Sequence, residues 1–228
     1  NPALTGVMNC NIRLVANYRN QWASVLKSNA FATYSASYDQ KIPVGRRDYF
    51  GVGGNFWGDK AGELDFSTIQ ARFSGSYSKY MGGDRSSSHY LVFGARAGIA
   101  QRRISFLSAR YGTQHDGEGG YCEACPTQED EAGDNFLFGD VSAGLLWFST
   151  FNENSSFYIG GAYAHMNNPN QSFFEDNQVE LYSKYTLHGG GEFEVAEDMS
   201  LVPGVVSFFQ GPSFELNGGT SLRFDLSN

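Results

Sequence analysis

Long stretches of this chain alternate strictly between apolar and polar side chains, and the clearest stretch covers residues 68–79. Every second residue there is apolar or small: Ile69, Ala71, Phe73, Gly75 and Tyr77. The residues between them are polar: Thr68, Gln70, Arg72, Ser74, Ser76 and Ser78. Successive side chains of an extended strand point to opposite faces, so a period of two predicts a strand with one apolar and one polar face.

The same period recurs along the chain and predicts about ten strands. We expect them at residues 11–19, 30–38, 49–57, 68–79, 90–102, 136–148, 155–164, 179–193, 199–209 and 214–226. Pro43 to Gly45 and Gly58-Asp59 are expected to end the strands before them. Most of these strands have about 9 to 14 residues, which is enough to cross a bilayer when the strand is tilted. The sequence therefore predicts an all-β, antiparallel up-and-down arrangement.

Composition excludes several classes of protein. No run of 18 apolar residues occurs, so no transmembrane helix is expected. The net charge of −8 at pH 7 argues against a nucleic-acid partner, which would require a basic stripe. Aromatic residues make up 15% of the chain and there are 28 glycines, a composition that suits twisted strands rather than a disordered chain.

The polar faces favour a transmembrane β-barrel over a soluble barrel, because a small soluble barrel fills its interior with apolar side chains. Here the polar faces carry charge, and six residues are candidates for the lumen: Arg72, Arg96, Asp140, Glu180, Lys184 and Glu192. We expect the carboxylates to be solvated or paired with Arg72 and Arg96. A β-sandwich shares the alternation, so strand length and repetition carry the preference.

Aromatic side chains near the predicted strand ends suggest interfacial girdles: Trp22, Tyr49, Trp57, Tyr80, Trp147, Phe148, Phe173 and Phe174. We expect residues 1–228 to form a single transmembrane β-barrel domain. Its N-terminal leader is expected to have been removed before Asn1, and its last strands are expected to follow Asn228.

The long acidic connection over residues 105–135 contains Cys122 and Cys125, spaced as CxxC. A local disulfide is the favoured interpretation, and a zinc site with His115 or two free thiols remain alternatives. Cys10 has no evident partner and does not follow a lipobox. We expect no metal and no cofactor.

Candidate catalytic residues do not emerge from the sequence. His165 and His188 lie at predicted strand ends, where a hydrogen-bonded structural histidine is expected. No G-x-S-x-G, Walker loop or H-E-x-x-H motif is present, so we expect no enzyme.

Several short motifs, in order along the chain, resemble the PorP/SprF outer-membrane proteins of the Bacteroidota. They are Asn1-Pro2-Ala3-Leu4-Thr5-Gly6, Asn17-Tyr18-Arg19-Asn20-Gln21-Trp22, Asp59-Lys60-Ala61-Gly62, Phe157-Tyr158-Ile159-Gly160, His165-Met166-Asn167-Asn168-Pro169-Asn170-Gln171-Ser172-Phe173 and Tyr185-Thr186-Leu187-His188-Gly189-Gly190. The resemblance gives His165 a loop-shaping role, with Asn168 and Pro169 in the same motif.

The resemblance implies a non-enzymatic outer-membrane barrel of the type IX secretion and gliding machinery. Its expected partners are outer-membrane lipids, a secreted surface protein with a type IX C-terminal domain, and other secretion subunits, including periplasmic ones. The loops at residues 105–135 and 165–178 would make these contacts. Two alternatives remain: a passive porin of the same fold, and a soluble β-sandwich or enzyme.

Overall fold

The computed structural model describes residues 1–106, 109–115, 117–122, 125–127, 133–152, 155–174, 178–196 and 198–224. Ten strands dominate: β1 (Ile12–Gln21), β2 (Phe31–Val44), β3 (Asp48–Ala61), β4 (Phe66–Gly82), β5 (Ser88–Arg103), β6 (Asn135–Thr150), β7 (Ser156–Ala164), β8 (Lys184–Ala196), β9 (Met199–Gln210) and β10 (Ser213–Phe224). The described residues also form the short helices η1 (Pro2–Leu4), α1 (Ala23–Leu26), η2 (Lys27–Asn29) and η4 (Gly112–Gln114). None of these helices is both long and apolar enough to cross a membrane.

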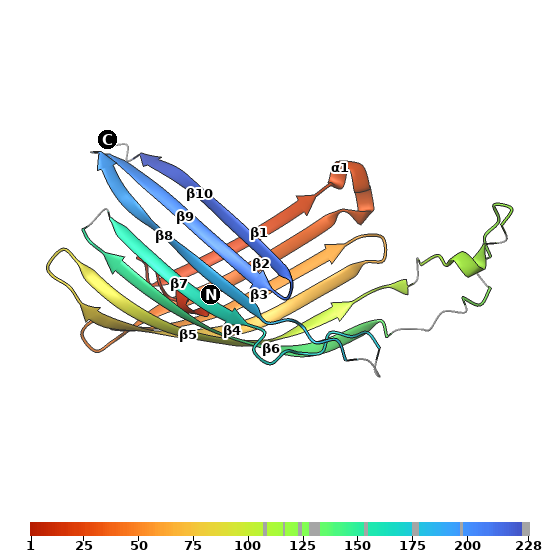
Figure 1. Ribbon diagram of the computed structural model, residues 1–228, viewed down its shortest axis with the longest axis horizontal. Coiled ribbons are helices and arrows are strands. Elements are labelled where there is room, and N and C mark those ends of the chain that lie inside the picture. Colours follow the sequence, from red (N-terminus) through yellow and green to blue (C-terminus); the bar gives the residue numbers. More distant parts are fainter. Residues whose placement is uncertain are drawn as a thin grey trace.

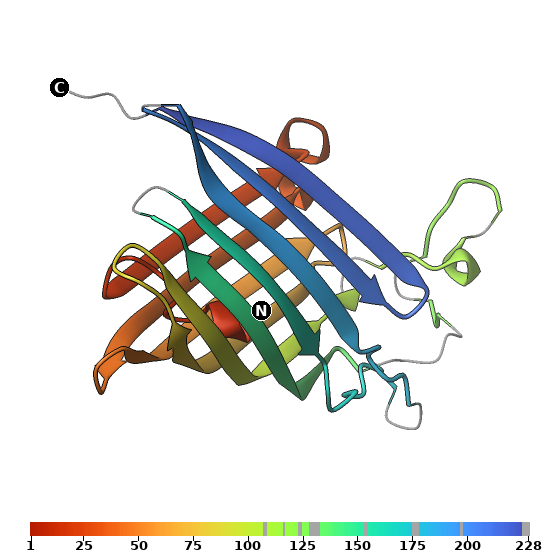
Figure 2. The ribbon, with the colours of Figure 1, turned by 60° about the vertical axis from the view of Figure 1, so that its left-hand side comes forward.

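All ten strands belong to one antiparallel sheet whose spatial order is the sequence order, β1 to β10. This confirms the predicted all-β, up-and-down architecture with about ten strands. The sheet curls into a deep trough (Figures 1 and 2). Its edge strands β1 and β10 do not pair with each other in the described part of the chain, so the sheet is not closed.

The convex face of the trough is apolar and exposed. Phe73 in β4 is 77% exposed, and Leu137, Leu187 and Ile159 on three other strands are each more than half exposed. The alternation places these side chains opposite the polar positions of the same strands. An extended apolar band of this kind is typical of strand faces that contact lipid.

The concave face is polar and holds most of the buried residues. Asp39, Ser76, Ser78, Asp140 and Ser142 are all buried there. A small apolar core lies among them, where Ala3, Val92 and Leu146 pack together. The polar faces predicted from the alternation therefore line the interior.

Two strands end later than predicted. β2 continues through Pro43 and ends at Val44, directly before the predicted Gly45, and β3 continues past Asp59 to Ala61. After β3 the chain reverses between Gly62 and Asp65, which have positive φ angles of 74° and 51°. The strand predicted to end at residue 226 is described only to Phe224, and residues 225–226 lie outside the described part.

The strand predicted over residues 179–193 begins only at Lys184. Before it, Leu181 N–H donates to the Pro169 carbonyl and Gln171 N–H donates to the Val179 carbonyl. The segment therefore bonds to its own loop instead of to a neighbouring strand. Glu180 is exposed in this loop and is not on a luminal strand face as predicted.

The predicted aromatic girdle is only partly correct. Trp147 pairs with Leu91 on the convex face, whereas Tyr49, Trp57, Tyr80 and Phe148 lie on the concave face. A residue near a strand end can lie on either face of the sheet. Its face is set by whether it falls on the odd or the even positions of the strand. Convex aromatic pairs that the sequence argument missed are Phe50–Tyr77 at one end of the sheet and Tyr163–Tyr185 and Phe209–Phe214 at the other.

The connections at the two ends of the sheet differ in length. One end, called here the long-loop end, carries the connections over residues 22–30, 62–65, 104–134, 165–183 and 211–212. The opposite, short-turn end carries those over residues 45–47, 83–87, 151–155 and 197–198. The described part of the β5–β6 loop, the longest of these connections, projects from the long-loop end of the trough (Figure 1).

Candidate functional site on the concave face

The N-terminal segment, residues 1–7, lies inside the trough against the middle of the sheet (Figure 2). Its short helix η1 contacts β4, β5 and β6. Pro2 and Ala3 are fully buried there. The segment fills part of the interior that would otherwise be open space between the walls.

Glycines on the sheet make room for this segment. Gly94 and Gly144 lie opposite each other in β5 and β6. A Cβ atom on Gly94 would collide with the Ala3 backbone, and one on Gly144 would collide with the Asn1 side chain. Position 94 therefore admits the N-terminal segment only as glycine, whereas a side chain at position 144 would require the Asn1 side chain to move.

Hydrogen bonds hold the segment along its length. Ser76 Oγ donates to the Thr5 carbonyl at 2.6 Å. Gly6 N–H donates to Asp39 Oδ1 at 2.9 Å, and Arg13 contacts both oxygens of the same carboxylate at 2.8 and 2.9 Å. Asp39 thus joins the segment to both β1 and β2.

A charged network lies next to the N-terminal segment. Arg72 in β4 contacts Asp140 Oδ2 at 3.0 Å, and His165 Nδ1 contacts Oδ1 of the same carboxylate at 2.8 Å. The Asp140 side chain is only 3% exposed. Arg96 lies one row along the sheet, opposite Ser142. The carboxylate is therefore shared between two partners and shielded from solvent.

The β7–β8 loop presents His165 to this network by a tight turn. His165 and Asn168 both have positive φ angles, of 57° and 38°. Asn167 then bridges to β6: its Nδ2 donates to the Gly139 carbonyl at 2.8 Å, and its Oδ1 accepts from Val141 N–H at 3.2 Å. These bonds clamp the loop onto the end of β6.

The same loop also reaches across the concave face. Arg102 Nη1 donates to Gln171 Oε1 at 2.5 Å. The Phe173 ring packs edge-on against the Phe136 ring, with 4.7 Å between the ring centroids. Its centroid lies 6.3 Å from that of the Phe66 ring. The hydrogen bond and the ring contacts join the β7–β8 loop to β4, β5 and β6. The described part of this loop therefore covers the interior.

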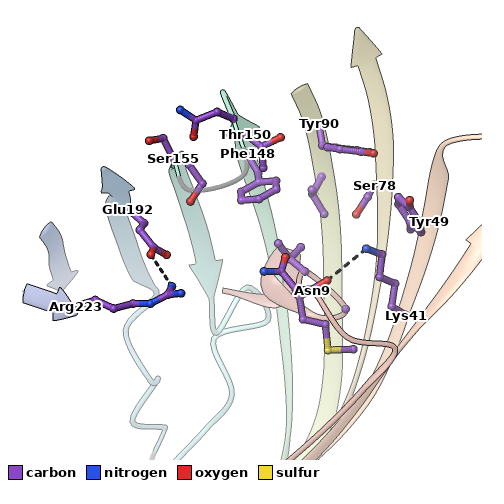
Figure 3. Close-up of a pocket in the computed structure, with 16 residues that line it drawn as sticks. Asn9, Lys41, Tyr49, Ser78, Tyr90, Phe148, Thr150, Ser155, Glu192 and Arg223 are labelled. Carbon is purple, nitrogen blue, oxygen red and sulfur yellow. Dashed lines mark hydrogen bonds and ion pairs between the residues drawn. The ribbon is translucent and has the colours of Figure 1, made fainter. Parts of the chain in front are cut away.

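A cavity of about 420 Å³ opens at the short-turn end of the trough (Figure 3). Lys41 lies on one side and donates to the Met8 carbonyl at 3.3 Å. Glu192 and Arg223 form an ion pair of 2.6 Å on the other side. Glu192 therefore pairs with Arg223 and not with Arg72 or Arg96 as expected. Lys184 lies farther along the concave face, with Nζ 4.3 Å from the Phe208 ring centroid.

The cysteines of the β5–β6 loop form a disulfide with an S–S distance of 2.02 Å. Within the described residues, no group of three or more His, Cys, Asp or Glu side chains could hold a metal ion. Beside the disulfide, Gln114 is buried, accepts from Tyr121 Oη at 2.8 Å and donates to the Cys125 carbonyl at 2.9 Å. These contacts give the projecting loop an ordered centre.

Cys10 is a free, exposed thiol.

Sequence reasoning missed three kinds of interior residue: the anchor Asp39, the guanidinium of Arg102, and the glycines that face the N-terminal segment. A signal for the glycines was present, because Gly94, Gly98 and Gly144 occupy polar-face positions of their strands. A small residue inside a strand often marks a place where another backbone approaches closely.

The fold and the interior match one known family. The model of the type IX secretion system membrane protein PorP/SprF matches residues 1–226. The chain belongs to the PorP/SprF family. No curated protein and no solved structure gives a match.

Ten of the PorP/SprF motif residues occupy three regions of the structure. Asn1 and Pro2 lie in the interior, where Asn1 Nδ2 is 2.8 Å from His188 Nε2. His165, Asn168 and Pro169 form the turn that closes on β6, and Ser183 Oγ donates to Asn168 Oδ1 at 2.8 Å. The remaining motif residues lie at the long-loop end of the edge strand β1 or just beyond it, and are exposed: Tyr18, Arg19, Asn20, Gln21 and Trp22.

Proposed function

We propose that this protein is a non-enzymatic outer-membrane component of the type IX secretion machinery that helps to secrete or anchor a partner surface protein through the partner's C-terminal secretion domain. Membership of the PorP/SprF family over residues 1–226 carries this proposal. The exposed apolar side chains of the convex face support the proposal that a single barrel domain is surrounded by lipid.

The long loops are the proposed contact surface for the secreted partner. Outer-membrane barrels carry short periplasmic turns and longer extracellular loops. By this rule the long-loop end faces the cell exterior. The described parts of the β5–β6 loop, with its Cys122–Cys125 disulfide, and of the β7–β8 loop, anchored through Asn167 and Phe173, offer surfaces there.

The short-turn end is the proposed contact surface for periplasmic subunits of the machinery. Its cavity combines the charges of Lys41, Glu192 and Arg223 with the rings of Tyr49 and Tyr90. Aromatic and arginine side chains are enriched in protein interfaces.

A passive porin fits less well, because the N-terminal segment lies across the middle of the trough. Pro2 and Ala3 are fully buried in contact with the sheet, and Ser76 and Asp39 bond to the segment. A diffusion channel would have to remain open along this path.

Purification from native membranes in mild detergent tests the proposal. We expect a secreted protein with a type IX C-terminal domain, and secretion subunits, to be identified by mass spectrometry with the tagged wild-type chain. Opening the projecting loop with C122S/C125S should reduce capture of the secreted partner. The matched short-turn variant R85S should retain it, because Arg85 is exposed at the opposite end.

Two results would contradict the proposal. One is that neither a secreted protein nor a secretion subunit is recovered while the pure protein conducts ions steadily in planar bilayers, which indicates a porin. The other is a chain that remains folded and monodisperse without detergent, which excludes the membrane assignment.

A further inference from the structure

A second cavity, of about 350 Å³, lies on the concave face toward the long-loop end, next to His165 and Leu181 of the β7–β8 loop. Seven of its lining side chains carry N–H donors: Asn55, Trp57, Gln70, Arg72, Arg102, His165 and Gln210. No Asp or Glu is among the described residues that line it. Its walls therefore offer hydrogen-bond donors and positive charge to whatever enters.

The positive charge near this cavity exceeds the negative charge that the sheet supplies. Arg72, Arg96 and Arg102 lie on the concave faces of β4 and β5, and Asp140 is the carboxylate that contacts this group. Asp140 is already shared between Arg72 and His165. A buried charge without a partner is expensive, so an excess of guanidinium groups in an interior calls for an anion.

The guanidinium groups are also short of acceptors. The Nε atoms of all three arginines are buried without a hydrogen-bond partner among the described residues. A guanidinium has five N–H donors, and buried polar groups that stay unpaired are uncommon in folded proteins. Two of these arginines, Arg72 and Arg102, line the cavity, and the Nε–H groups of both lack an acceptor among the described residues.

Arg102 is held in place for binding. Its Nη1 donates to Gln171 of the loop, and its guanidinium carbon lies 5.7 Å from the Phe138 ring centroid. Both contacts restrict the side chain before any ligand arrives. A pre-oriented planar guanidinium favours an oxyanion, because its parallel N–H groups match two oxygens of one group.

We propose that this cavity binds an oxyanion, namely a carboxylate, sulfate or phosphate group. Arg102 and Arg72 supply the charge, and the amides of Gln70 and Gln210 supply further donors. The group is either a free inorganic anion or the terminal carboxylate of a peptide. This site lies away from the short-turn cavity, on the interior side of the β7–β8 loop, whose His165 and Leu181 form part of its wall.

Calorimetric titration of the full chain in detergent, at constant ionic strength maintained with chloride, tests this site. We expect sodium sulfate to bind, and R102Q to weaken the binding at least tenfold. R103Q is the matched control, because Arg103 is the next residue of β5 and is exposed. It should bind sulfate as the wild type does. R102K, which keeps the charge but loses the planar fork, should give an intermediate affinity.

Two triglycine peptides distinguish the sources of the anion, one with a free terminal carboxylate and one amidated. Tighter binding of the free-acid peptide than of sulfate, together with no binding of the amide, identifies a chain end. Tighter sulfate binding identifies a free anion. The proposal is overturned if the wild type binds none of these probes, or if R102K and R102Q bind as tightly as the wild type. Neither result affects the partner capture that tests the proposed function.

Discussion

Asp140 connects three elements of the polar interior. Its buried carboxylate meets Arg72 from β4 and His165 from the β7–β8 loop. Both partners are largely shielded from solvent, since their side chains are 18% and 14% exposed. Removing the shared charge leaves Arg72 in the interior without a carboxylate in contact among the described residues.

We therefore expect D140N to destabilise the protein by on the order of 3 kcal/mol, because breaking a buried ion pair leaves its partner charge uncompensated. Urea unfolding in detergent micelles, followed by tryptophan fluorescence, measures the change. D84N is the control, since Asp84 is exposed in a short turn. Equal stability of D140N and D84N would contradict the role of the network.

Gly94 is a second single residue with a large structural effect, because it leaves room for the N-terminal segment. We expect G94A to displace residues 1–7 from the sheet, because the added Cβ meets the Ala3 backbone. Hydrogen–deuterium exchange of the N-terminal peptide should accelerate at least tenfold. G219A should leave the exchange unchanged, because a Cβ on Gly219 meets nothing within 4 Å. Unaltered exchange in G94A would show that the segment is not seated as described.

The strands determine which side chains face lipid, because successive residues of a strand point to opposite faces of the sheet. Most convex positions of the strands carry apolar side chains, and the register keeps these positions aligned between neighbours. Phe73, near the middle of β4, is aligned with Gly54 and Ala97 on the adjacent strands. The apolar band thus continues across strands rather than stopping at each one.

We expect F73R to lower the free energy of unfolding by about 2–4 kcal/mol, the range for a cationic side chain at the bilayer midplane. L91R, near the end of β5, should lower it by only about 0–1 kcal/mol, because the penalty falls toward the interface. Urea titration after reconstitution in lipid vesicles measures both. A similar effect at the two positions would argue against a lipid-facing band.

At the scale of the whole molecule, the two ends of the trough are unequal. Long loops gather at one end, and short turns and an open cavity lie at the other. The segment that fills the interior leads into β1 at the short-turn end. Such polarity suits a protein that has different partners on the two sides of a membrane.

Labelling of intact cells tests this polarity. In a C10S background we expect S24C, in the β1–β2 connection, to react with a membrane-impermeant maleimide. R85C, in the β4–β5 turn, should react only after the outer membrane is permeabilised. Both positions are exposed, so accessibility within the fold does not separate them. The reverse pattern would invert the proposed orientation.

Alternation was sufficient to predict the strands and their faces, because side-chain period depends only on local backbone geometry. It failed where non-local bonds decided an end. Pro43 stays within β2, and residues 178–183 leave the sheet to bond with Pro169 and Gln171. The girdle was mispredicted at Tyr49 and Trp57 for a related reason: position along a strand does not reveal the face.

The sequence by itself determined the fold class, the strand count and the polar character of the interior, and its motifs indicated the PorP/SprF family. Only the tertiary structure decided which charges meet. Arg72, Asp140 and His165 come from three elements, and Asp39 joins the N-terminal segment to β1 and β2. Local periodicity carries no information about such contacts, because they depend on strand register and on how the loops fold back over the sheet.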